Sequence, residues 1–363
     1  TQRKISDTVN KRIVDEVLQF RSDHGNMEYK NDSKIRILHI SDLHIKSRDQ
    51  ADKFRSQLET DLKQELKIKK LEYLVISGDI SKSSIENEYQ GAFDLVDSLV
   101  KRFGLNSDRV IIVPGNHDIN WDLSEESYKF IPKRKLPSRT PENATIPAGE
   151  TGALIRQDEL YRKRFDFFNT HFYRRIYLGR SYTKSYKNQV HIVERPDDKI
   201  LFVGFNSCWE VDHYFKTRSS INPRSLTSVI DFIQDGTYED WLKIAVWHHN
   251  VIGKDSMNDE FLEQLSVHNF QICLHGHIHQ AKEGYFKYDE KRGIRIIGAG
   301  TFGAPSKEQV TSIPLQYNLI NYDPKINEIV VTTRKKEKPE GSWSADARWG
   351  DKNNPVPFYS FKV

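Results

Sequence analysis

Side chains of the kind that bind metal ions follow five short apolar runs of this chain, in each case directly after the run. In chain order the groups are Asp42 with His44, Asp79, Asn116 with His117 and Asp118, His248 with His249, and His277 with His279. One Asp-x-His triplet is common by chance, whereas five such groups in order indicate a shared site. Carboxylate and imidazole ligands suit divalent Mn, Fe, Zn or Ni. Two ions about 3.5–4 Å apart need a bridging oxygen ligand, and a carboxylate fits that task.

The apolar runs before these groups are short enough to be strands, and amphipathic segments separate the first three. The five runs cover 35–40, 73–77, 110–113, 244–247 and 271–274. Apolar residues at helical spacing predict helices within 54–66 and 85–100, and Ser83 with Glu86 has the capping-box pattern of a helix start. Further strands are expected at 200–205, 294–297, 317–321 and 328–332, and a helix within 250–270. This order of elements favours right-handed crossovers and a parallel or mixed sheet. In open sheets of this kind, bound molecules and ions lie beyond the carboxyl ends of the strands.

Glycine directly precedes three of the candidate ligands. The pairs are Gly78-Asp79, Gly115-Asn116 and Gly276-His277. Because glycine adopts positive φ at little cost, we expect these glycines to make sharp turns that bend the ligands back into the site. Side chains alternate along extended backbone, so His277 and His279 would then lie on the same side.

The chain divides into three parts by its composition. Residues 1–33 are expected to form an N-terminal amphipathic helix, at 4–20, and a polar linker. Residues 34–335 form the main domain, with an insertion for specificity at about 121–190, and residues 336–363 form a C-terminal extension. Within the insertion, 121–152 holds four prolines and is predicted to be irregular.

The second part of the insertion, 156–188, is rich in basic and aromatic residues, and two interpretations fit it. Such a mixture could grip a nucleic acid through phosphate pairing and base stacking. An amphipathic helix with aromatic rings in the core and Arg and Lys in water would look the same. The helical interpretation is the favoured one, because it needs no partner.

Composition narrows the setting in which the protein works. The 363 residues are 37% hydrophobic and 29% charged, as in soluble globular proteins. A net charge of +4 permits a polyanionic partner without requiring one. Only two cysteines occur, Cys208 and Cys273, which favours a reducing, cytoplasmic setting.

No apolar run approaches the roughly 18 residues that span a bilayer, so no membrane partner is expected. The chain begins at Thr1, and we expect either a processed chain or a piece of a longer protein with further domains.

The five groups resemble the signature of the calcineurin-like metallophosphoesterase superfamily, which is Asp-x-His, Gly-Asp, Gly-Asn-His-Asp, a His after a strand, and Gly-His-x-His. All five blocks occur here in order, and the resemblance extends from about 35 to 332. It implies an α/β fold in which two mixed β-sheets pack as a sandwich flanked by helices. It also implies a phosphoesterase whose hydroxide nucleophile bridges two divalent ions, with Mn²⁺ favoured over Fe, Zn and Ni.

The resemblance also assigns roles to residues. One ion would be bound by Asp42, His44 and His279, the other by Asn116, His248 and His277, and Asp79 would bridge them. His117 would face the phosphate and protonate or stabilise the leaving oxygen, and Asp118 would tune it. Of the adjacent His248 and His249 only one can be a ligand, and the position directly after the strand favours His248. His39 and His275 lie inside strands and are interpreted as structural.

The substrate is less well defined than the reaction. Protein phosphatases of the superfamily continue the second block as Gly-Asp-x-Val-Asp-Arg-Gly, whereas this chain continues as Ile80-Ser81-Lys82-Ser83. The short block resembles the phosphodiesterase branches, which act on cyclic nucleotides or DNA. We therefore expect a phosphodiester substrate, either a nucleotide or a nucleic acid. The alternative is a catalytically weak nucleotide sensor within a larger protein, but the intact ligand set favours an enzyme.

Overall fold

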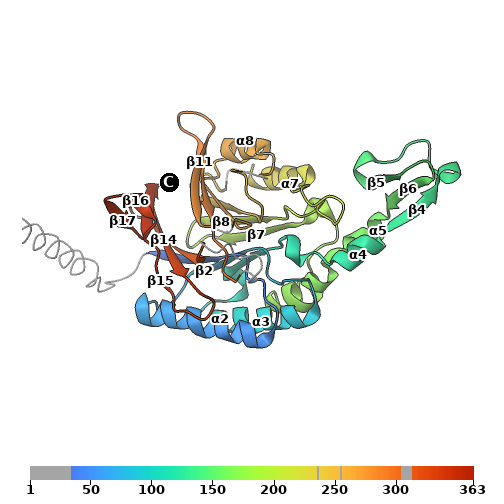
Figure 1. Cartoon of the computed structure of the whole chain (residues 1–363). Helices are drawn as coiled ribbons and strands as arrows, with labels where there is room; N and C mark the ends of the chain where they lie inside the picture. Colours follow the sequence, from blue (N-terminus) through green and yellow to red (C-terminus); the bar gives the residue numbers. More distant parts are fainter. Residues whose placement is uncertain (1–33, 235–236, 254–255, 279, 304–312) are drawn as a thin grey trace, which may run out of the picture.

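The computed structural model describes residues 34–234, 237–253, 256–278, 280–303 and 313–363. The helix expected at 4–20 and the candidate ligand His279 lie outside these residues. Two β-sheets pack face to face, and helices cover the outer face of each sheet (Figure 1). This architecture confirms the expected α/β sandwich of two mixed sheets.

The first sheet has seven strands in the order β15-β14-β13-β1-β2-β3, with β18 also paired to β14. Their bounds are β1 Ile35–Ile40, β2 Tyr73–Ser77, β3 Val110–Val113, β13 Leu315–Asp323, β14 Glu328–Lys336, β15 Ser344–Ala345 and β18 Phe358–Lys362. β1, β2 and β3 are parallel, while β13, β14, β15 and β18 pair antiparallel. The extension at 336–363 thus contributes strands to this sheet, together with a hairpin of β16 (Trp349–Asp351) and β17 (Asn354–Val356).

The second sheet has six strands in the order β11-β12-β10-β9-β8-β7. Their bounds are β7 Val190–Arg195, β8 Ile200–Phe205, β9 Leu242–Val246, β10 Ile272–His275, β11 Lys282–Lys287 and β12 Gly293–Gly298. The four inner strands are parallel, and the edge strands β7 and β11 are antiparallel to their neighbours. The carboxyl ends of β1, β2, β3, β9 and β10 carry the five predicted ligand groups.

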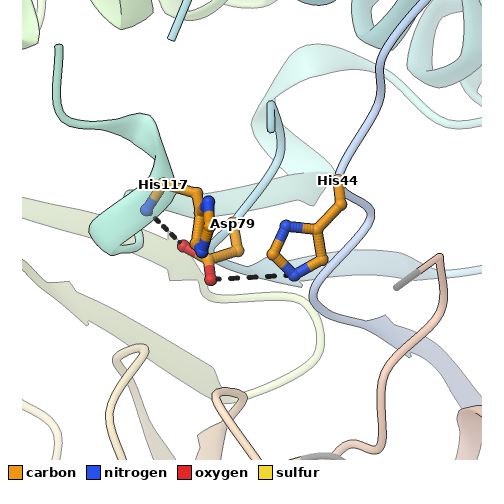
Figure 2. Close-up of side chains that lie close together, drawn as sticks. All are labelled: His44, Asp79 and His117. Atoms are coloured by element: carbon orange, nitrogen blue, oxygen red, sulfur yellow. Dashed lines mark hydrogen bonds and ion pairs between the residues drawn. The ribbon is translucent and has the colours of Figure 1, made fainter. Parts of the chain in front are cut away.

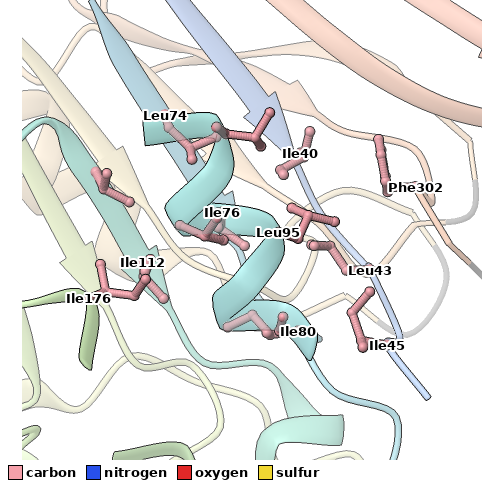
Figure 3. Close-up of a cluster of buried hydrophobic side chains, with 14 of the residues drawn as sticks. Ile40, Leu43, Ile45, Leu74, Ile76, Ile80, Leu95, Ile112, Ile176 and Phe302 are labelled. Atoms are coloured by element: carbon pink, nitrogen blue, oxygen red, sulfur yellow. The ribbon is translucent and has the colours of Figure 1, made fainter. Parts of the chain in front are cut away.

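The parallel strands β1, β2 and β3 are buried on both faces, which explains why their sequences are continuous apolar runs. Side chains alternate along β1, so that Ile35 and Ile37 point between the sheets while Leu38 and Ile40 point toward the helices. The helices on that side are α2 (Arg48–Thr60), which continues into a π-helical turn at Asp61–Glu65, and α3 (Glu86–Arg102). Figure 3 shows the apolar cluster between α3 and the sheet. On the other side, α7 (Pro223–Ile233) and α8 (Glu260–Val267) cover the second sheet.

The capping box predicted from Ser83 and Glu86 is wrong. Helix α3 begins at Glu86, and Ile85 occupies the N-cap position without a capping side chain. Instead the Glu88 carboxylate accepts hydrogen bonds from the backbone N–H groups of Lys82 and Ser83, at 3.1 and 2.7 Å. The acidic side chain therefore holds the preceding turn from inside the helix. The spacing rule failed because the turn at 81–84 folds back onto the helix.

The segment 121–152, predicted to be irregular, contains regular structure. It begins with helix α4 (Trp121–Glu126) and continues into β4 (Tyr128–Pro132) and β5 (Thr145–Ala148), both paired with β6 (Gly152–Arg156). Its prolines lie where a sheet tolerates them: Pro132 ends β4, Pro147 lies on the edge strand β5, and Pro137 and Pro141 are in the connection. Figure 1 shows this small sheet projecting from one end of the body.

Most aromatic residues of 156–188 belong to the core, as the favoured interpretation predicted, but Arg164 is buried with them instead of lying in water. Short helices replace the single helix: α5 (Asp158–Tyr161), a 3-10 turn (Arg162–Phe165), a π-helical turn (Phe168–Tyr173) and α6 (Arg174–Ile176). Seven rings are at most 9% exposed, namely Tyr161, Phe165, Phe168, Phe172, Tyr173, Tyr177 and Tyr182. These rings cannot stack on bases without unfolding. Among the described residues, no helix is both long and apolar enough to cross a membrane.

A buried ion pair fastens the helical layer to the first sheet. Asp61, 2% exposed, accepts a hydrogen bond of 2.9 Å from Arg334 Nε on β14 and another from the Tyr317 hydroxyl on β13. We predict that Asp61→Ala lowers the free energy of unfolding by about 3–5 kcal/mol, because it leaves the Arg334 charge buried without its partner. Urea denaturation measures the change.

Asp97→Ala is the matched control for Asp61→Ala. Asp97 pairs with Lys101 at 2.6 Å on the surface of α3, where the Lys101 side chain is 74% exposed. Its removal should cost less than about 1 kcal/mol. Equal losses in the two variants would contradict a special role for the buried pair.

Candidate metal centre

The loops that carry the candidate ligands leave the strands in an unusual backbone conformation. Asp42, His44, Asp79 and His277 all have positive φ, at 53°, 46°, 54° and 65°. This region is sparsely populated by residues other than glycine, and such strain gathers at functional sites. The surrounding hydrogen bonds hold it in place: Asp42 N donates to Gly78 O at 3.1 Å and His44 N to Asp79 O at 3.0 Å.

The glycines beside the ligands act differently from what the sequence suggested. Gly78 has a φ of 97°, as expected, but neither Gly115 nor Gly276 has positive φ. Gly115 and Gly276 are needed for close approach instead. A Cβ atom on Gly115 would lie 2.1 Å from Asp79 Oδ1, and one on Gly276 would lie 1.8 Å from Ser41 Oγ. The expectation of positive φ was therefore wrong at two of the three positions, since crowding between loops is invisible in the sequence.

Asp79 lies at the middle of the site. Its Oδ2 is 3.2 Å from His248 Nε2 and 3.9 Å from His44 Nε2, and its Oδ1 accepts a 2.8 Å hydrogen bond from His117 N. Figure 2 shows Asp79 between His44 and His117. Two groups of potential ligand atoms, each within 4.8 Å of one another, share this carboxylate: His44, Asp79 and His117, and Asp79, His248 and His277. One carboxylate common to two groups is the arrangement that a pair of bridged cations requires.

The remaining predicted ligands surround these two groups. Asp42 Oδ1 lies 3.9 Å from His44 Nε2, and Asp42 Oδ2 accepts a 3.0 Å hydrogen bond from His277 N. Asn116 Oδ1 lies 3.2 Å from His248 Nε2. The structure thus brings together six of the seven predicted metal ligands, and the seventh, His279, is outside the described residues. Buried carboxylate, amide and imidazole donors that converge in this way fit divalent transition-metal ions.

The orientation of His248 supports it over its neighbour as a ligand. His248 Nδ1 lies 2.8 Å from Ser77 O, and donation to this carbonyl leaves Nε2 to face Asp79 and Asn116. His249 turns its Nδ1 to Ser207 Oγ at 2.9 Å, and its ring packs against His277 with centroids 4.6 Å apart. His249 therefore lines the back of the site. His39 and His275, expected to be structural, are both buried, with His39 Nε2 2.9 Å from Ser77 Oγ.

Asp118 has a bracing position that the sequence did not reveal. The fully buried carboxylate accepts hydrogen bonds from the backbone N–H groups of Ile80, Ser81 and Gly115, at 3.2, 3.1 and 2.9 Å. It therefore joins the loop that carries Asp79 to the loop that carries Asn116. The imidazole of His117 is held separately, with Nδ1 2.8 Å from Lys82 O.

The charges of the cluster are strongly coupled. Burial raises the pKa of the Asp42 carboxyl to about 6. Burial opposes ionisation of Asp79 as well, but His248, His117 and His44 together hold its pKa well below the usual range. For His248, burial favours the neutral ring, yet Asp79 raises its pKa to about 9. The cationic form of His248 is thus stabilised beside the Asp79 anion, and a divalent ion at this position would displace the proton.

Comparison with known proteins shows the family of the chain. The family described as Calcineurin-like phosphoesterase matches residues 35–281, and the chain belongs to this family. Its members are metal-dependent phosphoric ester hydrolases. The metallophosphoesterase-like protein YydB of Bacillus subtilis (strain 168) is 22% identical over 331 residues, which cover 88% of this chain and 62% of that protein. The chain therefore spans less than two thirds of the length of this relative.

Two solved structures are similar to this chain at low sequence identity. A dimetal phosphatase from Danio rerio is 11% identical with a TM-score of 0.47, and the match covers 85% of this chain and 98% of that one. Vacuolar Protein Sorting 29 from Cryptosporidium parvum is 14% identical with a TM-score of 0.32, over 92% of this chain and 100% of that one.

The two adjacent histidines provide a test of the ligand set. We predict that His248→Asn loses one of two bound ions, because Nε2 is removed from beside Asp79 and Asn116. His249→Asn, the matched control, should retain both. Elemental analysis of each protein after loading with Mn²⁺ and desalting gives the metal content. Loss of an ion in His249→Asn but not in His248→Asn would transfer the ligand role to His249.

Proposed function

We propose that this chain hydrolyses a phosphodiester, either a nucleotide or a nucleic acid, at a centre of two divalent ions. The observation that carries the proposal is the Asp79 carboxylate, which belongs to both groups of ligand atoms. One ion would be bound by Asp42, His44 and His279, and the other by Asn116, His248 and His277. When bound, such ions lower the pKa of water and neutralise charge on the phosphoryl oxygens. Mn²⁺ is the proposed metal, with Fe, Zn and Ni as the alternatives that carboxylate and imidazole ligands also suit.

His117 is proposed as the proton donor to the leaving oxygen. The Lys82 carbonyl, 2.8 Å from Nδ1, holds a proton at that nitrogen, so Nε2 is the atom that gains or releases a proton. The ring lies edge-on to His44 with centroids 4.6 Å apart, which places it beside the ligands. His117 is among the groups that lower the pKa of the Asp79 carboxyl, so the two side chains interact electrostatically.

Asp118 is proposed to act on the reaction through the backbone. Its three N–H donors belong to the loops of Asp79 and Asn116, so the carboxylate fixes the spacing between a bridging ligand and a terminal ligand. A change of about 1 Å in the spacing of catalytic groups can lower the reaction rate of a preorganised site by about 10²-fold.

The segment after Asp79 supports a diester over a phosphoprotein substrate. Ser81 and Ser84 are buried there and turn inward, with Ser81 Oγ 3.2 Å from His117 O and Ser84 Oγ 3.0 Å from Asp118 O. No arginine occupies this turn to hold a dianionic monoester. A phosphodiester carries one negative charge, so the metal ions and His117 suffice to neutralise it.

The setting proposed for the protein is the cytoplasm, within a longer polypeptide. Cys208 and Cys273 are both buried free thiols, which suits a reducing compartment. The match to 62% of a longer relative agrees with additional domains.

We predict that His117→Ala keeps both metal ions and loses about 10²–10⁴-fold in turnover, because a general acid contributes about that much. The loss should be larger for diesters with alkoxide leaving groups than for bis-p-nitrophenyl phosphate, whose leaving group needs little protonation. His268→Ala, at the end of α8, is the control histidine. Equal losses with both leaving groups would contradict the role of proton donor, and loss of an ion would make His117 a ligand.

Substrate class is tested by a screen of the Mn²⁺-loaded protein against cyclic nucleotides, oligonucleotides, bis-p-nitrophenyl phosphate and phosphoserine peptides. The diesters should be hydrolysed with the higher kcat/KM. A preference for phosphoserine peptides over every diester would overturn the substrate class. Bound metal without turnover of any ester would instead favour a nucleotide sensor.

A further inference from the structure

The small sheet that projects from the body is joined directly to the metal centre. We call residues 127–156, which include β4, β5 and β6, the arm (Figure 1). The arm is reached from Asn116–Asp118 through the single helix α4. Asn120 caps this helix, and its backbone N–H donates to Arg164 O at 2.9 Å. The arm therefore starts from the same edge of the sandwich as the candidate ligands.

A buried polar network fixes the base of the arm. Asp212, 0% exposed, accepts hydrogen bonds from the hydroxyls of Tyr128 on β4 and Tyr161 on α5, at 2.8 and 2.9 Å. The guanidinium of Arg164, also 0% exposed, lies 3.6 Å from the Tyr161 ring centroid and donates to Cys208 O at 3.3 Å.

This network reaches the metal ligands through the loop after β8. Ser207, next to Cys208, lies with its Oγ 3.3 Å from His248 N and 2.9 Å from His249 Nδ1. A buried network of this kind holds two elements in one arrangement. The arm is consequently a fixed part of the site and extends it beyond the body.

Two exposed aromatic rings line the face of the arm that continues from the body. Tyr214, 41% exposed, contacts the Tyr128 ring with centroids 4.9 Å apart. Phe130, 50% exposed, lies two residues further along β4 and thus on the same face as Tyr128. Cross-strand neighbours Leu154 and Ile146, aligned with Phe130, complete an apolar row that is only partly buried. The row runs across the three strands of the small sheet.

The charge of the arm is strongly positive. The arm has five exposed basic residues and only two exposed acidic ones. The basic residues are Lys129, Lys133, Arg134, Lys135 and Arg139, and the acidic residues are Glu142 and Glu150. The whole chain is nearly balanced, with 55 Lys and Arg against 51 Asp and Glu, so the arm is more basic than the chain as a whole. Two arms of one sign would repel each other, which argues against a second copy as the occupant. Exposed aromatic rings beside clustered Lys and Arg are the combination that binds single-stranded nucleic acid.

We propose that the arm binds a single-stranded nucleic acid whose other end enters the metal centre. Bases would stack on Phe130 and Tyr214, and phosphates would pair with the 133–135 run at the tip. The tip lies roughly 25 Å from the metal edge, given the lengths of α4 and β4. A mononucleotide is too short to touch both places, so the arm selects polymers. The proposal rests on the proposed phosphodiesterase function and names its substrate class.

The test compares two triple variants, each of which removes three positive charges, one set from the arm and one from elsewhere on the surface. A third variant removes an exposed aromatic ring of the arm. Lys133→Ser/Arg134→Ser/Lys135→Ser alters exposed side chains at the tip of the arm. Lys67→Asn/Lys69→Ser/Lys70→Ser removes an equally compact exposed cluster before β2, at the opposite ends of the strands. Asn replaces Lys67 because its φ is 55°, which Asn tolerates. Phe130→Ser removes the exposed ring.

Each variant is assayed in two ways. Fluorescence anisotropy measures binding of a single-stranded phosphorothioate oligonucleotide, which resists hydrolysis, as a function of salt. Steady-state rates give kcat/KM for a long oligonucleotide, a dinucleotide and bis-p-nitrophenyl phosphate, all with Mn²⁺-loaded protein.

We expect the arm variant to bind at least about tenfold more weakly, with a salt slope shallower by about 2, since each lost phosphate contact removes about 0.7. Phe130→Ser should weaken binding by about fivefold or more. In the arm variant and in Phe130→Ser, kcat/KM should fall for the long oligonucleotide but not for the dinucleotide or bis-p-nitrophenyl phosphate. The variant at Lys67, Lys69 and Lys70 should match wild type in both binding and kcat/KM.

Several outcomes overturn the proposal. The proposal fails if the arm variant binds the oligonucleotide as tightly as wild type. It also fails if the two triple variants lose the same amount of binding affinity. Tighter binding of duplex than of single strands excludes a stacking role for Phe130. Dissociation of a dimer by Phe130→Ser in sedimentation would make a second copy the occupant. If wild type binds through the arm but hydrolyses no diester, the proposed function fails while the arm proposal stands.

Discussion

The Asp79 carboxylate is 2% exposed and lies among the rings of His44, His117 and His248. Burial of an anion is expensive unless positive charge and hydrogen bonds surround it. Here the backbone N–H of His117 and the imidazoles supply both, and Asp79 is close enough to two groups of ligand atoms to serve each. The five loops at this edge are arranged around that one charge. A pair of cations would complete the neutralisation that the histidines begin.

The loops accept local strain to bring their ligands together. Asp42, His44, Asp79 and His277 adopt positive φ, and their neighbours compensate through backbone hydrogen bonds and through Asp118. Gly115 and Gly276 leave no room for a Cβ atom between the loops. Strain of this kind persists only where the surrounding core is rigid. The parallel strands β1, β2 and β3, buried on both faces, provide that rigid base.

The insertion carries two kinds of aromatic residue that composition alone cannot separate. Phe168 and Phe172 are fully buried against α3, and they contribute to the core. Phe130 of the insertion remains exposed, as does Tyr214, which follows the insertion in the chain and packs on Tyr128. The buried rings stabilise the main body of the protein. The exposed rings form part of a surface that extends outward from the site. Separating the two required the burial of each ring.

The sequence by itself determined most of the inner strands of the two sheets and the identity of most candidate ligands, because short apolar runs followed by Asp, Asn or His are local patterns. It also favoured His248 over His249, which the orientation of the two rings supports. It did not show the bracing contacts of Asp118, the crowding at Gly115 and Gly276, or the start of α3, since each depends on residues that meet only after folding. The arm was missed for a similar reason: its prolines suggested irregular chain, but sheet edges and turns accommodate them. Pairing across strands, and the burial that it creates, is decided by tertiary structure because it joins segments that the local pattern treats as separate.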